Sequence, residues 1–129
     1  MARIMVVDDE PDILFLTGIM LKKRGYEIIE ASSGEECLDK LKKEKPDLIL
    51  LDILGVGGDK ILEKIKNDEK FKSIPVVMFT VVKEEKIGSM FECAGYDAYI
   101  EKPFERDKML ATVQSLLAPE KAAAQELAD

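Results

Sequence analysis

The strongest constraint on this chain is an alternation of short apolar runs with segments of helical spacing. Five runs rich in aliphatic and β-branched residues lie at 3–7, 26–29, 47–51, 75–79 and 98–100. Apolar residues recur at helical spacing between and after these runs, most clearly at Ile87, Met90, Phe91 and Ala94 and at Met109, Leu110, Val113, Leu116 and Leu117. Weaker helical patterns define apolar faces at Ile13, Leu16 and Met20, at Cys37, Leu38 and Leu41, and at Ile61, Leu62 and Ile65. The pattern predicts an α/β chain of five β-α units.

Helix boundary signals agree with this pattern. Pro11 suits the first turn of a helix. Ser33 followed three residues later by Glu36 is typical of a capping box. Gly95 and Pro119 are expected to end the fourth and fifth helices.

The first, third and fourth apolar runs contain almost no polar residue, at 4–7, 48–51 and 76–79. Strands of this kind are buried on both faces, as in a parallel sheet covered by helices. Right-handed crossovers then give a doubly wound sheet in a three-layer α/β/α sandwich. The length of 129 residues predicts one domain over 1–118, followed by a short Ala/Glu-rich tail at 119–129.

Composition excludes several classes of function. The chain has 26 Asp and Glu against 19 Lys and Arg, a net charge of −7, which argues against general nucleic-acid binding. The basic stretches at 22–24 and 40–45 are interpreted as solvated helix faces. With no His, the chain cannot use an imidazole base or carry a phosphohistidine. No targeting segment and no apolar run of membrane-spanning length is found, so a cytoplasmic protein is expected.

Chemically reactive residues follow the predicted strands. Asp8 and Asp9 follow the first strand, Asp52 the third, Thr80 the fourth and Lys102 the fifth. Because ligands bind beyond the carboxyl ends of parallel strands, we expect these side chains to meet at one edge of the sheet.

Three carboxylates so close together repel one another by several kcal/mol unless a cation or a proton neutralises them. A set of oxygen ligands of this kind favours a hard divalent cation, Mg²⁺ or Mn²⁺. A carboxylate nucleophile, a metal, a lysine and a hydroxyl are together what phosphoryl transfer to an Asp requires.

The motifs VVDDE at 6–10, LLD at 50–52, FT at 79–80 and YIEKPF at 99–104 are in the order and spacing of a known family. In these motifs the chain resembles the receiver domain of two-component response regulators, of the stand-alone, chemotaxis-regulator-like kind, over residues 1–118. The resemblance implies the flavodoxin-like strand order 2-1-3-4-5.

The resemblance also implies a role for each acidic residue. Asp52 would be the phospho-acceptor and one of the ligands of Mg²⁺. Asp9 would bind the metal directly and Asp8 through a water molecule, with the backbone carbonyl of Leu54 as a further ligand.

Three further residues take roles from the same resemblance. Lys102 and Thr80 would contact the phosphoryl group, and a cis peptide bond is expected between Lys102 and Pro103. Tyr99 would be the aromatic residue that moves inward together with Thr80 after phosphorylation. A downstream protein partner would then bind the face formed by the fourth helix, fifth strand and fifth helix.

Three positions depart from the family pattern. Val56 stands where Pro is expected, Lys60 where Gly is expected and Val81 where a smaller residue is common. The glycine-rich segment 55–58 is expected to be freer than a Pro-containing loop. We expect slower phosphotransfer or slower loss of phosphate than in a typical receiver.

The leading hypothesis is a non-enzymatic, single-domain receiver that catalyses only its own phosphorylation and dephosphorylation. Because the chain lacks His, a sensor histidine kinase or a histidine phosphotransfer protein must supply the phosphoryl group. A degenerate receiver that acts as an unphosphorylated scaffold remains an alternative. A small phosphatase of the haloacid-dehalogenase type is a second alternative, although its usual DxD pair is replaced here by adjacent Asp8 and Asp9.

Overall fold

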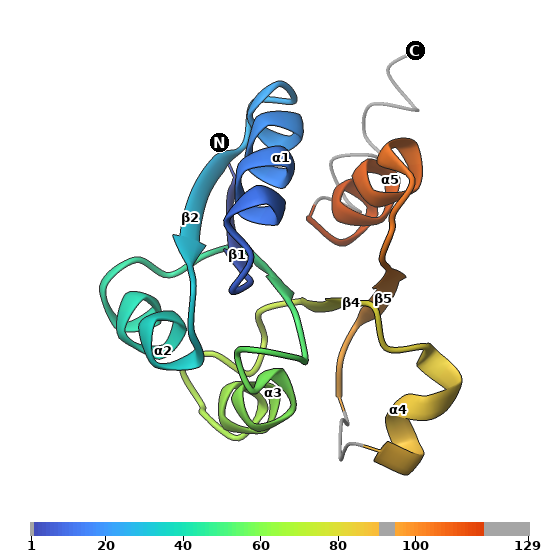
Figure 1. Ribbon diagram of the computed structural model, residues 1–129. Coiled ribbons are helices and arrows are strands. Elements are labelled where there is room, and N and C mark those ends of the chain that lie inside the picture. Colours follow the sequence, from blue (N-terminus) through green and yellow to red (C-terminus); the bar gives the residue numbers. More distant parts are fainter. Residues whose placement is uncertain (1, 91–94, 118–129) are drawn as a thin grey trace.

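A computed structural model describes residues 2–90 and 95–117, in which five strands alternate with five helices (Figure 1). The strands are β1 (Arg3–Val7), β2 (Glu27–Ala31), β3 (Leu48–Leu51), β4 (Val76–Thr80) and β5 (Ala98–Glu101). The helices are α1 (Pro11–Lys22), α2 (Gly34–Lys43), α3 (Gly58–Lys66), α4 (Glu84–Met90) and α5 (Arg106–Leu117). All strand pairs are parallel and the order is β2-β1-β3-β4-β5, which confirms the predicted fold class and topology.

Two hydrophobic cores lie on opposite faces of the sheet, because successive strand residues point to opposite sides. Met5 and Val7 of β1 pack with apolar residues of α2, α3 and α4, whereas Ile4 and Val6 pack with residues of α1 and α5. All four residues of β3 are fully buried. Burial on both faces explains why β1, β3 and β4 are continuous apolar runs in the sequence.

The predicted helix starts are confirmed in atomic detail. Pro11 occupies the first turn of α1. The Ser33 hydroxyl accepts a hydrogen bond from the Glu36 amide at 3.1 Å, and the Glu36 carboxylate accepts one from the Ser32 amide at 2.8 Å. Strand β2 extends two residues beyond the predicted end at 29. The predicted helical positions Phe91 and Ala94, the end signal Pro119 and the tail at 119–129 lie outside the described residues.

The apolar face predicted for the first helix is wrong at one position. The helical spacing predicts Leu16 on the buried face, yet it is 52% exposed, next to Phe15 at 65%. The buried residues of α1 are Leu14, Thr17, Gly18 and Leu21. Helix α1 carries apolar residues around most of its circumference, so spacing alone does not identify the side that packs on the sheet.

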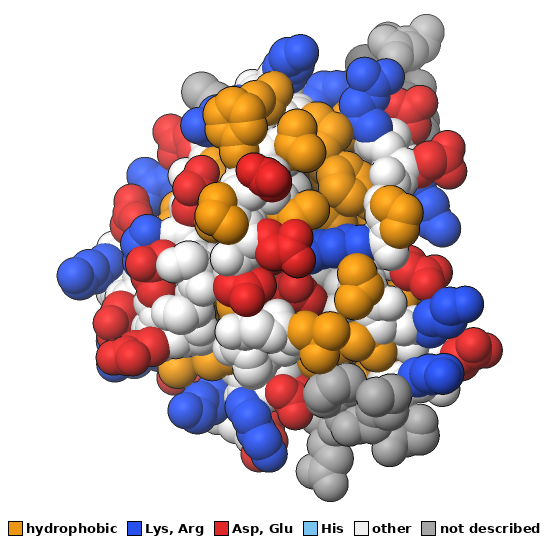
Figure 2. All heavy atoms as spheres, viewed as in Figure 1, with side chains coloured by type: hydrophobic (Ala, Val, Ile, Leu, Met, Phe, Trp, Pro, Cys, Tyr) orange, Lys and Arg blue, Asp and Glu red, His pale blue; other side chains and the backbone are white. Residues whose placement is uncertain are grey.

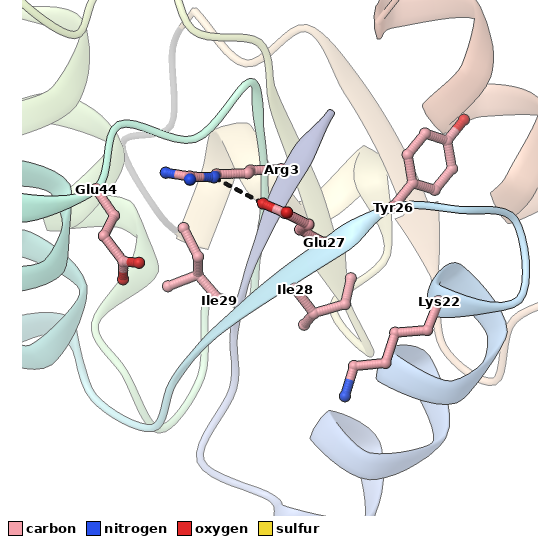
Figure 3. Close-up of a pocket in the computed structure, with 7 residues that line it drawn as sticks. All are labelled: Arg3, Lys22, Tyr26, Glu27, Ile28, Ile29 and Glu44. Atoms are coloured by element: carbon pink, nitrogen blue, oxygen red, sulfur yellow. Dashed lines mark hydrogen bonds and ion pairs between the residues drawn. The ribbon is translucent and has the colours of Figure 1, made fainter. Parts of the chain in front are cut away.

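Strand β2 forms one edge of the sheet, and charged side chains accompany it. Arg3 Nε pairs with Glu27 Oε2 at 2.8 Å across the amino ends of β1 and β2. This pair lies in a pocket of about 430 Å³ that also contacts Tyr26 and Glu44 (Figure 3). Charges on an edge strand discourage pairing with a further strand.

Among the described residues, no helix is long and apolar enough to cross a membrane.

Candidate functional site

The polar residues predicted at the strand ends lie together at the carboxyl edge of the sheet. Asp8 follows β1, Asp52 follows β3, Thr80 ends β4 and Lys102 follows β5. These residues are 1%, 6%, 0% and 9% exposed, respectively, so these four side chains are almost entirely removed from water. Figure 2 shows acidic side chains gathered at the centre of one face of the molecule, beside a basic side chain. Burial of so many polar groups in one place is uncommon outside functional sites.

Lys102 joins two of the carboxylates. Its Nζ donates hydrogen bonds to Asp8 Oδ2 and, at 3.1 Å, to Asp52 Oδ2. Burial by itself lowers the pKa of Lys102, but the hydrogen bond to Asp8 and the negative charge of Asp52 outweigh it, so the pKa lies above its ordinary value. Lys102 is therefore a fixed positive charge at neutral pH. Its Nζ also lies 5.1 Å from the centre of the Phe79 ring.

Short backbone turns orient the acidic and hydroxyl groups. Asp8 Oδ1 accepts a hydrogen bond from the Glu10 amide at 2.9 Å, and Asp52 Oδ1 accepts one from the Leu54 amide at 3.3 Å. The Thr80 carbonyl accepts a hydrogen bond from the Lys102 amide at 2.9 Å. The peptide bond between Lys102 and Pro103 is cis, as the resemblance implies. The Asp8 and Asp52 carboxylates are thus held by backbone amides just after their own strands, and the backbone of Lys102 is held by the end of β4.

The acidic residues are arranged so that one cation can contact all of them. Carboxylate oxygens of Asp8, Asp9 and Asp52 lie within 4.8 Å of one another, and Asp9 is the exposed member. The N-cap of α1 is Glu10 and no side chain caps that helix, so Asp9 is not engaged as a helix cap. A Cβ at Gly55 would lie 2.3 Å from Asp9 Oδ2, so any larger residue there would displace this carboxylate from its position. The all-oxygen donor set fits Mg²⁺ or Mn²⁺.

Comparison with known proteins decides the family. A family model described as the response regulator receiver domain matches residues 4–114. The chain belongs to the response regulator receiver family. It is 31% identical to protein PilH of Pseudomonas aeruginosa, a match that covers 92% of this chain and 99% of PilH.

Other relatives are longer than this receiver or have a solved structure. The chain is 36% identical to the CAI-1 autoinducer sensor kinase/phosphatase CqsS of Vibrio cholerae, covering 86% of this chain but only 17% of CqsS. It spans about half the length of the transcriptional regulators it matches. The crystal structure of response regulator protein TrrA from Thermotoga maritima, in complex with Mg(2+)-BeF, has a TM-score of 0.80 and 35% identity, covering 91% of this chain and 100% of TrrA.

The loop after Asp52 in this receiver has a geometric need for each of its glycines. Gly55 and Gly57 have φ angles of +81° and +66°, in the left-handed region that other residues rarely adopt. A Cβ at Gly58 would lie 1.8 Å from the Asp52 carbonyl oxygen. Val56 is buried against the core instead of pointing to solvent. The glycine-rich sequence therefore fits a closely packed loop and does not by itself indicate a free one.

Thr80 and Tyr99 of the receiver are linked through a residue that sequence reasoning missed. Thr80 Oγ1 accepts a hydrogen bond from the Val82 amide at 3.3 Å, and the Val82 carbonyl accepts one from the Tyr99 hydroxyl. Tyr99 is half-buried, and burial, together with the charge of Glu101, raises its pKa. The connection runs through backbone atoms of Val82, so no side-chain pattern in the sequence signals it.

Two exposed apolar residues stand next to the site. Leu54 follows Asp52 by two positions and is 43% exposed, and Val81 directly follows Thr80 and is 56% exposed. Lys60, the other departure from the family pattern, is an exposed residue of α3. Val81 and Leu54 are thus placed to contact a molecule that approaches the carboxylates.

Proposed function

We propose that this receiver accepts a phosphoryl group on Asp52 from a histidine of a sensor kinase or phosphotransfer protein and signals through a second protein. The observation that carries the proposal is the buried pair formed by Lys102 and Asp52, with Asp8 bound to the same ammonium group. A buried carboxylate held beside a fixed positive charge is a suitable acceptor, because the lysine attracts the oxygens of an incoming phosphoryl group.

The transfer step is a substitution at phosphorus. An Asp52 carboxylate oxygen forms a bond to phosphorus while the bond from phosphorus to the donor imidazole nitrogen breaks, and the imidazole leaves with the electron pair. The Lys102 ammonium group then donates a hydrogen bond to one phosphoryl oxygen, and the Thr80 hydroxyl donates a hydrogen bond to another. Mg²⁺ or Mn²⁺ would be held by Asp9, Asp52 and the Leu54 carbonyl, and by Asp8 through a water molecule. When bound, the metal neutralises negative charge on the phosphoryl group. The relative TrrA was solved in complex with Mg(2+)-BeF, which supports a magnesium site in this receiver as well.

The surface of α1 beside the site suits the phosphodonor. Phe15, Leu16 and Ile19 are large apolar residues on this helix and are 65%, 52% and 37% exposed. Figure 2 shows apolar side chains gathered next to the acidic centre, over the part of the molecule where Figure 1 places α1. The donor histidine must reach Asp52, so the donor surface around it covers the neighbouring elements. We assign this apolar surface to the donor protein.

Phosphorylation would reach the partner surface through Thr80 and Tyr99. A phosphate on Asp52 that draws the Thr80 hydroxyl toward it breaks the bond from the Val82 amide, and the Val82 carbonyl is what holds the Tyr99 hydroxyl. The face of α4, β5 and α5 around Tyr99 would then bind the downstream protein. We propose a cytoplasmic location for this exchange.

The direct test is phosphorylation by acetyl phosphate with and without Mg²⁺, followed by intact mass measurement. We expect wild type to gain the mass of one phosphoryl group only when Mg²⁺ is present. Asp52→Asn should gain none, and Asp12→Asn, which removes an exposed carboxylate of α1, should behave like wild type. No added mass on wild type would favour the unphosphorylated scaffold, and steady turnover of a phosphate ester would favour the phosphatase.

The exposed Val81 is expected to slow the loss of phosphate by hindering the attacking water. Val81→Ala should shorten the half-life of the phosphorylated chain, because a smaller side chain opens the approach to Asp52. The decay of the phosphorylated mass after removal of the donor measures this. An unchanged half-life would show that Val81 has no such role.

A further inference from the structure

A groove rich in lysine lies at the opposite edge of the sheet from Asp52. A groove of about 670 Å³ separates the end of α2 from the segment between α3 and β4. Its lining comes from two stretches of chain, Leu41, Lys42, Lys43 and Lys45 from the first and Asp68, Glu69, Lys70, Phe71 and Ser73 from the second. These stretches precede β3 and β4, so the groove lies at the amino ends of two neighbouring strands.

The charge of this groove is opposite to that of the whole chain. Lys42, Lys43, Lys45 and Lys70 line it, and none of them forms an ion pair within the described ranges 2–90 and 95–117. Two acidic residues also line the groove, so the four lysines outnumber the carboxylates by two. Asp68 accepts a hydrogen bond from the Lys70 amide at 2.8 Å, and Glu69 pairs with Lys72 at 2.8 Å. Four unpaired ammonium groups therefore surround one cavity in a chain of net charge −7.

Helix stabilisation explains only some of these lysines. Lys42 and Lys43 lie in the last turn of α2, where positive charge favours the helix dipole. Lys45 lies beyond the helix end, and Lys70 lies in the connection between α3 and β4. The intervening acidic residue Glu44 lines the other pocket, with Arg3 (Figure 3). The convergence of lysines from two separate segments is thus not required by either segment alone.

The groove also has an apolar part, which narrows the class of ligand. Phe71 supplies this part and is half-buried against the core, whereas Leu41, which also lines the groove, is almost fully buried. A ligand that fits carries negative charges spaced around an aliphatic or aromatic side chain. A concave site of this size suits an extended peptide segment better than a flat membrane surface. Nucleic acid is disfavoured, because the net charge of −7 repels a long polyanion around the groove.

We propose that this lysine groove binds an acidic segment of a partner protein, one that alternates Asp or Glu with large apolar residues. The groove is at the opposite edge of the sheet from Asp52, so the partner can remain bound while the phosphodonor occupies the carboxyl edge. The interaction is independent of the proposed phosphorylation chemistry.

The test uses a fluorescent peptide of alternating Glu and Leu with one Phe, measured by anisotropy against the full chain. Lys43→Gln/Lys70→Gln should weaken binding at least tenfold, and added salt should weaken wild-type binding because the attraction is between charges. The control Lys23→Gln/Lys64→Gln removes two exposed lysines that do not line the groove and should bind like wild type. Backbone amide NMR signals of 41–45 and 70–73 should shift on titration.

Three results would overturn the proposal. These are no binding of the peptide, equal loss of binding in the groove variant and the control, or binding to anionic phospholipid vesicles in place of the peptide. Phosphorylation of the groove variant by acetyl phosphate should match wild type, so failure of the groove proposal is distinguishable from failure of the phosphorylation proposal.

Discussion

Charged side chains are buried at the carboxyl ends of the parallel strands and exposed at their amino ends. At the carboxyl edge, Asp8, Asp52 and Lys102 are at least nine-tenths buried and bonded to one another. At the amino edge, Arg3 and Glu27 form an ion pair at 2.8 Å with both side chains about half exposed. Exposed pairs contribute between 0 and about 1 kcal/mol to stability, whereas a buried pair carries a large desolvation cost. The difference indicates that the carboxyl edge is arranged for chemistry and the amino edge for solvation and contact.

The excess of negative charge at the carboxyl edge supports this interpretation. Lys102 offers one positive charge to the three carboxylates of Asp8, Asp9 and Asp52. An arrangement chosen only for stability would balance these charges or replace them with apolar residues. This surplus of negative charge suits a divalent cation, and we therefore expect the site to bind one.

Removing Lys102 should have the largest effect, because it leaves the carboxylates unpaired in a buried site. Lys102→Met is expected to lower the free energy of unfolding by about 3–5 kcal/mol in metal-free buffer. Urea denaturation measures this. Lys102→Arg keeps the positive charge and should be less affected, and Lys108→Met, at an exposed lysine of α5, should stay close to wild type. A Lys102→Met variant as stable as wild type would mean that the buried carboxylates do not need this charge.

Asp9→Asn should remove the response to Mg²⁺. Wild type should gain about 2.7 kcal/mol of stability when Mg²⁺ is present at about 100 times its Kd, because a ligand that binds only the folded state stabilises it. Asp9→Asn should be more stable than wild type without metal, by about 1 kcal/mol, since repulsion among the carboxylates is reduced. Thermal unfolding with and without Mg²⁺ measures both effects. A variant that still gains the full stabilisation would exclude Asp9 as a ligand.

Alkaline pH should reduce the contribution of Lys102 by a smaller, graded amount. The pKa of Lys102 is raised above its ordinary value of 10.5, so the folded state holds this proton more tightly than the unfolded state. The stability that this proton provides is fully present below pH 10.5 and is lost as the pH rises through the higher folded-state value. The difference in unfolding free energy between wild type and Lys102→Met should therefore be constant up to pH 10.5 and should become smaller at higher pH. A difference that widens at alkaline pH would contradict this sign.

Breaking the amino-edge pair should have the smallest effect. Arg3→Met is expected to leave the free energy of unfolding nearly unchanged, because the Arg3 and Glu27 side chains are about half exposed. Urea denaturation at low and high salt measures this. High salt should remove any difference in unfolding free energy between Arg3→Met and wild type. A loss as large as that of Lys102→Met would erase the contrast between the two edges.

The sequence predicts the sheet well because continuous apolar runs and helical spacing are local signals. The site could also be predicted, since topology brings the strand ends at Asp8, Asp52 and Lys102 to one edge. Other features depend on how distant segments pack. The exposure of Leu16 depends on which side of α1 meets the sheet, and the need for glycine at position 58 depends on the Asp52 carbonyl.

Two further features have no local signal. The link between Thr80 and Tyr99 uses backbone atoms of Val82, which any residue would supply. The lysine groove joins two segments whose charges, read along the chain, are typical of ordinary solvated faces. Only their convergence in space distinguishes them, and spacing along the chain does not contain it.

The most direct test of the proposed chemistry is to locate the phosphoryl group on the chain. Reduction of the acetyl phosphate-treated protein with borohydride converts an aspartyl phosphate to homoserine, and tandem mass spectrometry of the peptides then identifies the position. The buried pair of Asp52 with Lys102 predicts homoserine at position 52 and unchanged Asp at positions 8 and 9. Homoserine at position 8 or 9, or at none of the three, would contradict the assignment of Asp52 as the phospho-acceptor.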